Sequence, residues 1–432
     1  MKKILAKILT SIVVIGMLCS CGATATGLTD QAPAANAPAT LSIETAATPA
    51  EAATEAEAAT EATPEETSAT PAETAVAQAD ATTATPPTAT ATPAYPFESA
   101  VETAAKLGIG WNLGNAFDSI DSESLGLDAE TYWGNPKTTP ELVKAVKDAG
   151  FDTIRIPVTY INHFDENGKI DEAWLARVKE VVGYATANDL YAIINIHHDG
   201  QQENGWLRPT VTGEEREKMV ETFTTLWTQI ANYFEDCGGN VLFAGMNEFH
   251  EGYSWSYPED YDDITNRLNQ AFVTTVRATG GNNAERILIT PSYNTLTAAT
   301  SRYILPTDTI EGRQMLEVHC YDPWEFAGQG QGSWGSDNEA EVEDRVNTLK
   351  TNFVDKGIPV IMGEYGAVRS VNPERFDYIR YVTAGYYKNG ITPIWWDNGQ
   401  FGTGTENFGL MDRTNATVFD TEALEAIMSA KD

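Results

Sequence analysis

The segment YAIINIHHDG, at residues 191–200, shows the structural pattern that repeats through most of this chain. Its first six residues form a short, mostly apolar run with β-branched side chains, and apolar residues at helical spacing precede it over residues 172–188. The run ends abruptly in two histidines and an aspartate. A helix followed by a short buried strand is the repeating unit of α/β proteins with a parallel sheet.

The same unit recurs along most of the chain. Short apolar runs predict eight strands, at residues 107–112, 151–156, 191–196, 241–246, 286–290, 315–318, 358–362 and 391–396. Longer segments with helical spacing lie between most of them, at residues 139–149, 172–188, 214–233, 261–278, 337–356 and 373–388. Thr138 is expected to cap the first of these helices, and Gly150, Gly357 and Gly390 to end three of them.

Eight strands that alternate with helices over residues 95–432 predict a closed (β/α)8 barrel, the TIM barrel. A doubly wound open sheet is the alternative fold. No Gly-rich phosphate-binding loop follows the first predicted strand, which argues against that alternative. We therefore expect residues 95–432 to form one α/β domain, with its active site at the C-terminal ends of the strands.

The N-terminus predicts export. Three lysines within the first seven residues precede an apolar stretch over residues 8–18, which is typical of a secretory signal and too short to span a bilayer stably. The adjoining LCSC, at residues 18–21, resembles a bacterial lipobox, so residues 1–21 are interpreted as a lipoprotein signal peptide. By that resemblance Cys21 carries the lipid and anchors the protein to a bacterial membrane, facing the outside of the cell. An ordinary signal peptide is the alternative.

Residues 22–94 differ sharply in composition from residues 95–432. They are mostly Ala, Thr, Pro and Glu, with ten acidic residues, no Lys or Arg, and no aromatic residue. Such a composition cannot bury enough apolar surface to offset the entropy of ordering the backbone. We expect a disordered linker that tethers the barrel.

The overall composition excludes several classes of protein. The chain has 28 Lys and Arg against 62 Asp and Glu, for a formal net charge of −34. Nucleic acid is not an expected partner, because binding phosphates requires clustered cations. Four cysteines in 432 residues cannot form a disulfide scaffold, and the single long apolar run excludes a polytopic membrane protein.

Aromatic and imidazole side chains collect at the predicted strand ends. All five histidines lie there: His163, His197, His198, His250 and His319. Eight of the ten tryptophans lie there or in the loops after the strands: Trp111, Trp133, Trp206, Trp255, Trp324, Trp334, Trp395 and Trp396. Trp174 and Trp227 lie on predicted helices, where core packing explains them. Exposed aromatic faces along a polar cleft suit the C–H faces of sugar rings.

Two carboxylates stand out in this rim. Glu248 lies at the end of the fourth predicted strand, and Glu364 lies at the end of the seventh. Strands three apart on a ring of eight face each other across the barrel mouth. Two carboxyl groups about 5–5.5 Å apart, one an acid and one a nucleophile, define retaining glycoside hydrolysis. Arg155 and Tyr321, also at strand ends, could supply the donors that keep one of them ionised.

The chain resembles glycoside hydrolase family 5, a family of retaining β-glycanases on this barrel, over essentially all of residues 97–432. The resemblance is carried by seven short motifs in the same order, GWNLGN at 110–115, RIP at 155–157, NIHHDG at 195–200, GMNE at 245–248, HCY at 319–321, GEYG at 363–366 and WWDNG at 395–399. The double histidine and the WWDNG motif are similar to subfamily 4, which is rich in endo-β-1,4-glucanases and xyloglucanases.

The resemblance implies a role for each matching residue. It makes Glu248 the acid/base and Glu364 the nucleophile, and it implies that Asn247 bonds the 2-hydroxyl of the sugar in subsite −1. Four further residues would support or position these groups: Arg155, His197, His319 and Tyr321. The implied substrate-binding residues are Asn112, His198, Trp206 and Trp396. Which member of the pair Trp395 and Trp396 forms the floor of subsite −1 depends on strand register, and Trp396 is favoured.

The resulting hypothesis is a lipid-anchored, secreted, retaining endo-β-1,4-glucanase that needs no cofactor and has a monomeric catalytic domain. Xyloglucanase, lichenase and mannanase activities are alternatives within the family. A glycan-binding lipoprotein without activity is the alternative of a different class, against which the pair Glu248 and Glu364 argues. A metal site is not expected, because His197 and His198 are adjacent on a strand and should point apart.

Overall fold

The computed structural model describes residues 95–432 except 121–124, 201–204, 252–256 and 371. The expected signal peptide, the lipidated Cys21 and the linker lie outside the described residues, so these domain boundaries remain predictions. In the part of the chain that is described, no helix is both long enough and apolar enough to span a membrane.

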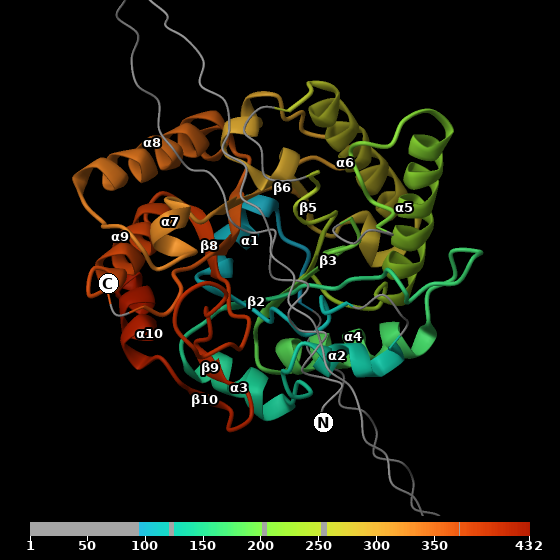
Figure 1. The fold of residues 1–432 in the computed structure, drawn as a ribbon. Coiled ribbons are helices and arrows are strands. Elements are labelled where there is room, and N and C mark those ends of the chain that lie inside the picture. Colours follow the sequence, from blue (N-terminus) through green and yellow to red (C-terminus); the bar gives the residue numbers. More distant parts are fainter. Residues whose placement is uncertain (1–94, 121–124, 201–204, 252–256, 371) are drawn as a thin grey trace, which may run out of the picture. The chain divides into compact units, whose positions relative to one another are not determined.

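Eight parallel strands close into a barrel in the order of the chain, which confirms the predicted (β/α)8 fold (Figure 1). The strands are β1 (Gly110–Asn112), β2 (Thr153–Ile156), β3 (Tyr191–Asn195), β4 (Val241–Ala244), β5 (Leu288–Pro291), β6 (Gln314–Cys320), β7 (Val360–Tyr365) and β8 (Ile391–Trp395). Each overlaps the apolar run that predicted it. A small antiparallel pair, β9 (Met411–Asp412) and β10 (Thr417–Val418), comes after the barrel in the chain.

Most of the helices form a ring around the strands (Figure 1). The six expected helices are α3 (Pro140–Asp148), α4 (Glu172–Ala187), α5 (Gly213–Tyr233), α6 (Asp260–Ala278), α8 (Ser336–Asn352) and α9 (Arg375–Tyr387). Four more had not been expected, α1 (Ala100–Leu107), α2 (Ala129–Tyr132), α7 (Trp324–Ala327) and α10 (Thr421–Met428). Between β5 and β6, where every residue is described, two short 3-10 segments, Tyr293–Thr295 and Ala298–Ser301, take the place of an α-helix.

The expected cap of α3 was wrong by one residue. Thr139, rather than Thr138, caps the helix, and its side chain accepts a hydrogen bond from the Leu142 amide over 3.2 Å. Pro140 comes next as the first helical residue, where its fixed φ fits and its missing N–H costs nothing. Gly357 and Gly390 precede β7 and β8 as expected, with φ values of 79° and 76° that favour glycine.

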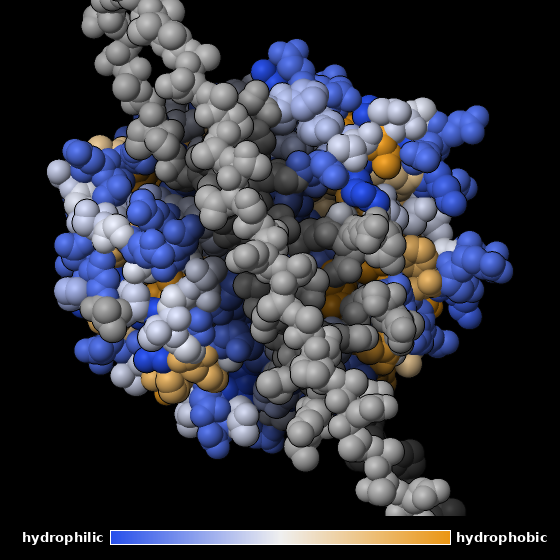
Figure 2. Space-filling view, in the orientation of Figure 1, coloured by the Kyte–Doolittle hydropathy of each residue, from blue (hydrophilic) through white to orange (hydrophobic). Residues whose placement is uncertain are grey.

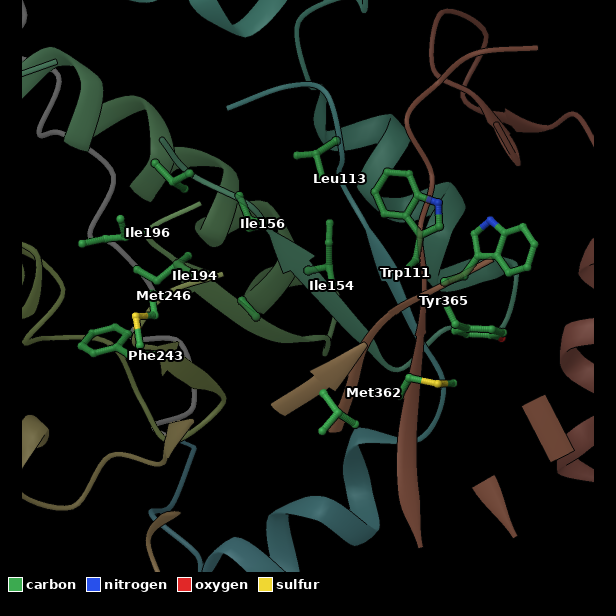
Figure 3. Close-up of a cluster of buried hydrophobic side chains, with 14 of the residues drawn as sticks. Trp111, Leu113, Ile154, Ile156, Ile194, Ile196, Phe243, Met246, Met362 and Tyr365 are labelled. Carbon is green, nitrogen blue, oxygen red and sulfur yellow. The ribbon is translucent and has the colours of Figure 1, made fainter. Parts of the chain in front are cut away.

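Strand alternation separates two hydrophobic layers. Ile193, Leu242 and Ile361 point into the barrel, where Leu107 of α1 packs against them; in Figure 1, α1 lies at the centre of the ring. The second layer fills the space between strands and helices and includes Ile154, Ile156, Ile194, Ile196, Phe243, Met362 and Tyr365 (Figure 3). Trp174 and Trp227 are fully buried in this layer, as predicted. On the face of the molecule that Figure 2 shows, hydrophilic side chains dominate the periphery.

Candidate active site

Strand alternation sends Arg155 into the barrel mouth. Its neighbours in β2, Ile154 and Ile156, belong to the outer hydrophobic layer (Figure 3), so the side chain between them points inward. Arg155 is fully buried there. One guanidinium nitrogen, Nη1, donates to Glu364 over 2.8 Å, and the other, Nη2, donates to Asn247 over 2.7 Å.

A β-bulge aims Glu364. His319 of β6 pairs with Glu364, whereas Val318 pairs with Met362, so Gly363 is the extra residue. Met362 and Tyr365 both lie in the outer layer (Figure 3). The bulge therefore lets two successive residues, Gly363 and Glu364, lie on the inner side between them, as bulges next to active sites often do.

The Glu364 carboxyl group is held from two sides. Besides the bond from Arg155, it accepts a hydrogen bond from the Tyr321 hydroxyl over 3.1 Å. Its side chain is only 7% exposed. Burial raises the pKa of Glu364, while the cations His319 and Arg155 oppose that increase. Burial also raises the pKa of Tyr321 well above its usual value, so this hydroxyl stays a donor.

Glu248 lies just beyond β4, with its side chain 16% exposed. Its Oε1 is 2.9 Å from Nδ1 of His319. One carboxylate oxygen of Glu248, one of Glu364 and a ring nitrogen of His319 all lie within 4.8 Å of one another. The two predicted catalytic carboxyl groups are thus brought together at the barrel mouth, as their positions on the fourth and seventh strands implied.

The surrounding carboxylates determine the charge of His319. Burial lowers its pKa, but Glu364, Glu248 and Glu317 outweigh that effect and raise the pKa to about 9. His197 behaves in the opposite way, because burial and the neighbouring groups His198, Arg155 and His319 lower its pKa well below the usual value. Near neutral pH His319 is therefore a cation and His197 is neutral.

Asn112 is positioned differently from the expectation that it binds substrate. It is fully buried, its amide nitrogen donates to the Gly363 carbonyl over 2.8 Å, and its Oδ1 accepts from Arg155 over 3.0 Å. Asn247 is also buried, and its Nδ2 lies 3.4 Å from Nε2 of His197. Asn112 thus links Arg155 to the backbone of β7, while Asn247 lies between Arg155 and His197.

Strand register separates the two adjacent tryptophans. Trp395 is fully buried against Tyr365 in the outer layer. Trp396 lies on the inner side, nearly parallel to the ring of His197 at a centroid distance of 5.9 Å. Its indole packs with Tyr321 and Phe408, next to the carboxyl groups.

The other rim tryptophans do not all present a free face. Trp111 and Trp334 are buried in the core, contrary to the expectation of exposed aromatic faces. Trp206 is half-buried, and its Nε1 donates to Asp199 over 2.8 Å. Trp133 and Trp324 are half-buried as well, and Trp133 packs beside His198. Trp255 lies outside the described residues.

The expectation that His197 and His198 point apart was wrong. β3 ends at Asn195, so strand alternation no longer applies, and the two rings lie 4.3 Å apart. With Asp118 they bring three potential metal ligands within 4.8 Å. Both Asp118 oxygens, however, accept backbone amide hydrogen bonds, from Asn115 and Ala116.

Two side chains differ from what their sequence positions suggested. His163 comes after β2 but stacks on Trp174 with a centroid distance of 3.8 Å, away from the carboxyl groups. Glu317, which was not singled out, lies within the site and contacts both Arg155 and His319. Its alternation with His319 along a mostly apolar strand was the available signal.

The fold and the facing carboxyl groups define a glycoside hydrolase. The family model described as Cellulase (glycosyl hydrolase family 5) matches residues 117–402, and the chain belongs to this family. Its membership agrees with an enzyme rather than a glycan-binding lipoprotein without activity.

Individual relatives agree with this assignment. Endoglucanase A of Ruminococcus albus is 36% identical over 349 residues, which cover 76% of this chain and 92% of that protein. A xyloglucan-specific endo-β-1,4-glucanase of Bacteroides ovatus is 35% identical over 363 residues, covering 76% and 70%. The structure of a broad-specificity endoglucanase from Clostridium longisporum matches with a TM-score of 0.72 and 33% identity, covering 77% of this chain and 98% of that one.

Proposed function

We propose that the protein is a secreted, retaining endo-β-1,4-glucanase that cuts internal bonds of plant cell-wall β-glucans by double displacement. One observation carries the mechanism: Glu248 and Glu364 each place an oxygen within 4.8 Å of the other and of His319. Retaining glycosidases hold their two carboxyl groups about 5–5.5 Å apart, whereas inverting enzymes leave about 6.5–9.5 Å for a water molecule.

In the first step, Glu364 attacks the anomeric carbon as the glycosidic bond breaks, and Glu248 donates its proton to the departing oxygen. Arg155 and Tyr321 hold the attacking carboxylate in place, which supplies orientation before the reaction starts. Asn247, oriented by Arg155, would bond the 2-hydroxyl of the sugar, and Trp396 would lie beneath its ring.

In the second step, Glu248 is a carboxylate and removes a proton from water, which attacks the anomeric carbon and releases Glu364. Two inversions give net retention of configuration. His319 contacts Glu248 over 2.9 Å and stays beside it through both steps. The reaction requires no metal or cofactor.

We expect the leaving part of the polymer to lie in a cavity beside His319. A cavity of about 260 Å³ is bordered by His319, by the β5–β6 connection and by α8. Its lining includes the polar side chains Thr297, Asp322 and Thr348, which could bond sugar hydroxyls. Relatives named for xyloglucan and, in one solved structure, for lichenase activity keep xyloglucan and mixed-linkage glucan as alternative substrates, with mannan as a third.

The sequence supports a location outside the cell. A signal peptide over residues 1–21, a lipid on Cys21 and a linker over residues 22–94 would hold a monomeric barrel at a bacterial membrane surface.

The decisive experiment incubates the barrel with carboxymethyl cellulose, xyloglucan, lichenan, glucomannan and xylan. Product lengths distinguish internal from terminal cleavage, and proton NMR during the first minutes identifies the anomer released from cellopentaose. A β-anomer formed first supports retention. An α-anomer formed first, or no shortening of any β-1,4-glucan, would contradict the proposal.

A further inference from the structure

Glu317 is a fully buried acidic residue at the base of the catalytic site. It lies in β6, two residues before His319, so both side chains point into the barrel. Because it has no exposed surface, Glu317 cannot touch a polysaccharide. Any contribution to the reaction must therefore pass through other side chains.

Two such side chains meet at one oxygen of Glu317. Oε1 lies 3.0 Å from Nη2 of Arg155 and 3.3 Å from Nε2 of His319. Arg155 is the residue that holds Glu364, and His319 is the residue that holds Glu248. One oxygen of Glu317 thus contacts both of the side chains that hold the two catalytic carboxyl groups.

We propose that Glu317 is a positioning residue that fixes the Arg155 guanidinium and directs the Nε2 proton of His319, and so sets how both catalytic carboxyl groups are held. The inference rests on the proposed function, because it concerns the two carboxyl groups of double displacement.

The contact with Glu317 determines which nitrogen of His319 faces Glu248. Nε2–H donates to Glu317, which leaves Nδ1 toward Glu248. The charge of Glu248 is one of the causes that keep His319 cationic. When Glu248 is a carboxylic acid that charge is lost, and a neutral His319 can accept a hydrogen bond from its O–H at Nδ1. When Glu248 is a carboxylate, a cationic His319 can donate to it from the same atom. One ring orientation therefore serves Glu248 both before and after it gives up its proton.

The backbone of β7 makes room for Glu317. A Cβ atom added to Gly363 would lie 2.1 Å from Glu317 Oε1, so any other residue there would displace the carboxylate. Gly363 is also the extra residue of the bulge that aims Glu364. The same glycine thus seats Glu317 and turns the proposed nucleophile inward.

Stability alone does not explain this carboxylate. Its Oε2 makes no hydrogen bond within the part of the chain that is described. Burying a charge with an unsatisfied oxygen is costly, and an apolar side chain of similar volume is often no worse for the fold. A role in arranging Arg155 and His319 accounts for its presence.

The charge of Glu317 should also appear in the titration of the site. The titratable groups that act on His319 come from several strands: Glu248 after β4, Glu364 of β7 and His197 after β3, in addition to Glu317 itself. Arg155 of β2 acts on the same group of side chains through its contacts with Glu317 and Glu364. Removing one of three carboxylates leaves His319 less able to hold its second proton. Once His319 loses that proton, it can no longer donate a hydrogen bond to Glu248 from Nδ1. Glu317→Gln should therefore move the basic limb of the pH–rate profile to lower pH.

The test is Glu317→Gln, which keeps the shape of the side chain and removes its charge. We expect kcat on cellopentaose to fall about tenfold to hundredfold through misplacement of the reacting groups, with KM unchanged. Asp308→Asn is the matched control, because Asp308 forms a buried ion pair with Arg277 on the flank of the barrel. Both variants should lower Tm, but only Glu317→Gln should shift the basic limb.

A second measurement keeps the inference testable if Glu317→Gln does not fold. With ¹⁵N-histidine labelling there are five ring systems to resolve, and His319→Gln identifies the signals of His319. In the wild-type protein Nε2 should carry a proton at all pH values from 6 to 10, with Nδ1 losing its proton near pH 9.

A proton on Nδ1 alone, or titration of His319 near pH 6.5, would overturn the inference. An unchanged kcat and pH profile in folded Glu317→Gln would do the same. Failure of the wild-type enzyme to cut any glucan would instead remove the proposed function, while the NMR result would still decide how His319 and Glu317 interact.

Discussion

Arg155 donates a hydrogen bond to Glu364 across the barrel over 2.8 Å, and neither side chain is more than 7% exposed. A buried charge pair of this kind depends on both partners, because removing one leaves the other charge uncompensated. The arginine offsets part of the burial that raises the pKa of Glu364. Solvent contributes little to holding this carboxylate, so its position is set by the strands.

Glu364→Gln should abolish turnover while polymer binding survives. The amide keeps the size of the carboxyl group but cannot form the glycosyl ester, so we expect kcat to fall at least about a thousandfold. Binding measured by affinity electrophoresis in a glucan gel should stay within about threefold of wild type, since Trp396 and the rest of the cleft are unchanged. Near-wild-type turnover would show that Glu364 is not the nucleophile.

Glu248→Ala should lose activity according to the leaving group. Substrates with a poor leaving group need the proton from Glu248, whereas an aryl cellobioside with a good leaving group departs without it. We therefore expect a much larger loss of kcat/KM on polymer than on 2,4-dinitrophenyl cellobioside. Equal losses on both substrates would contradict the role of acid.

Much of this architecture was predictable because it depends on local pattern. Eight apolar runs with helical segments between most of them were enough to place the strands, and the strand ends then located Glu248 and Glu364 on facing sides of the mouth. The opposite orientations of the two adjacent tryptophans were also predictable in principle. Once β8 was placed, only one of Trp395 and Trp396 could point inward.

Other features depend on contacts that sequence spacing does not encode. His163 comes after a strand like the site histidines, yet it stacks on Trp174 of α4, a partner that only the folded chain reveals. Asn112 belongs to a motif that resembles family 5, but its amide is used to hold Arg155 and the β7 backbone. The bulge at Gly363 was likewise hidden, because an extra residue in a strand leaves no mark in an apolar run.

Trp395→Ala and Trp396→Ala should separate stability from binding. Trp395 is buried in the outer layer, so its truncation should cost about 3–5 kcal/mol of unfolding free energy. Trp396 lies beside the carboxyl groups, so its truncation should lower kcat/KM on cellopentaose with a smaller change in Tm. Thermal melts and steady-state kinetics of both variants check this, and the reverse pattern would assign the floor of subsite −1 to Trp395.

His163 should make the fold sensitive to acid. Burial lowers its pKa to about 4, against about 6.5 when unfolded. Between these values the unfolded chain binds a proton that the folded chain does not, so the stabilisation is present above pH 6.5 and is lost as pH falls toward 4. The loss should approach about 3 kcal/mol. Denaturant unfolding at pH 7 and pH 4.5 should show a smaller difference for His163→Phe than for wild type; equal differences would contradict the assignment.

Cys21 should determine where the enzyme is found. If it carries lipid, the wild-type protein made in a bacterial host should partition into the detergent phase of Triton X-114 and incorporate labelled palmitate, since acyl chains supply the apolar area needed for membrane binding. Cys21→Ser should be neither labelled nor retained in that phase. Cys19→Ser is a closely matched control, because it removes a thiol two residues away and leaves the proposed lipidation site intact. Labelling that disappears in Cys19→Ser but persists in Cys21→Ser would identify Cys19 as the lipidated residue. No labelling of the wild-type protein would favour an ordinary signal peptide.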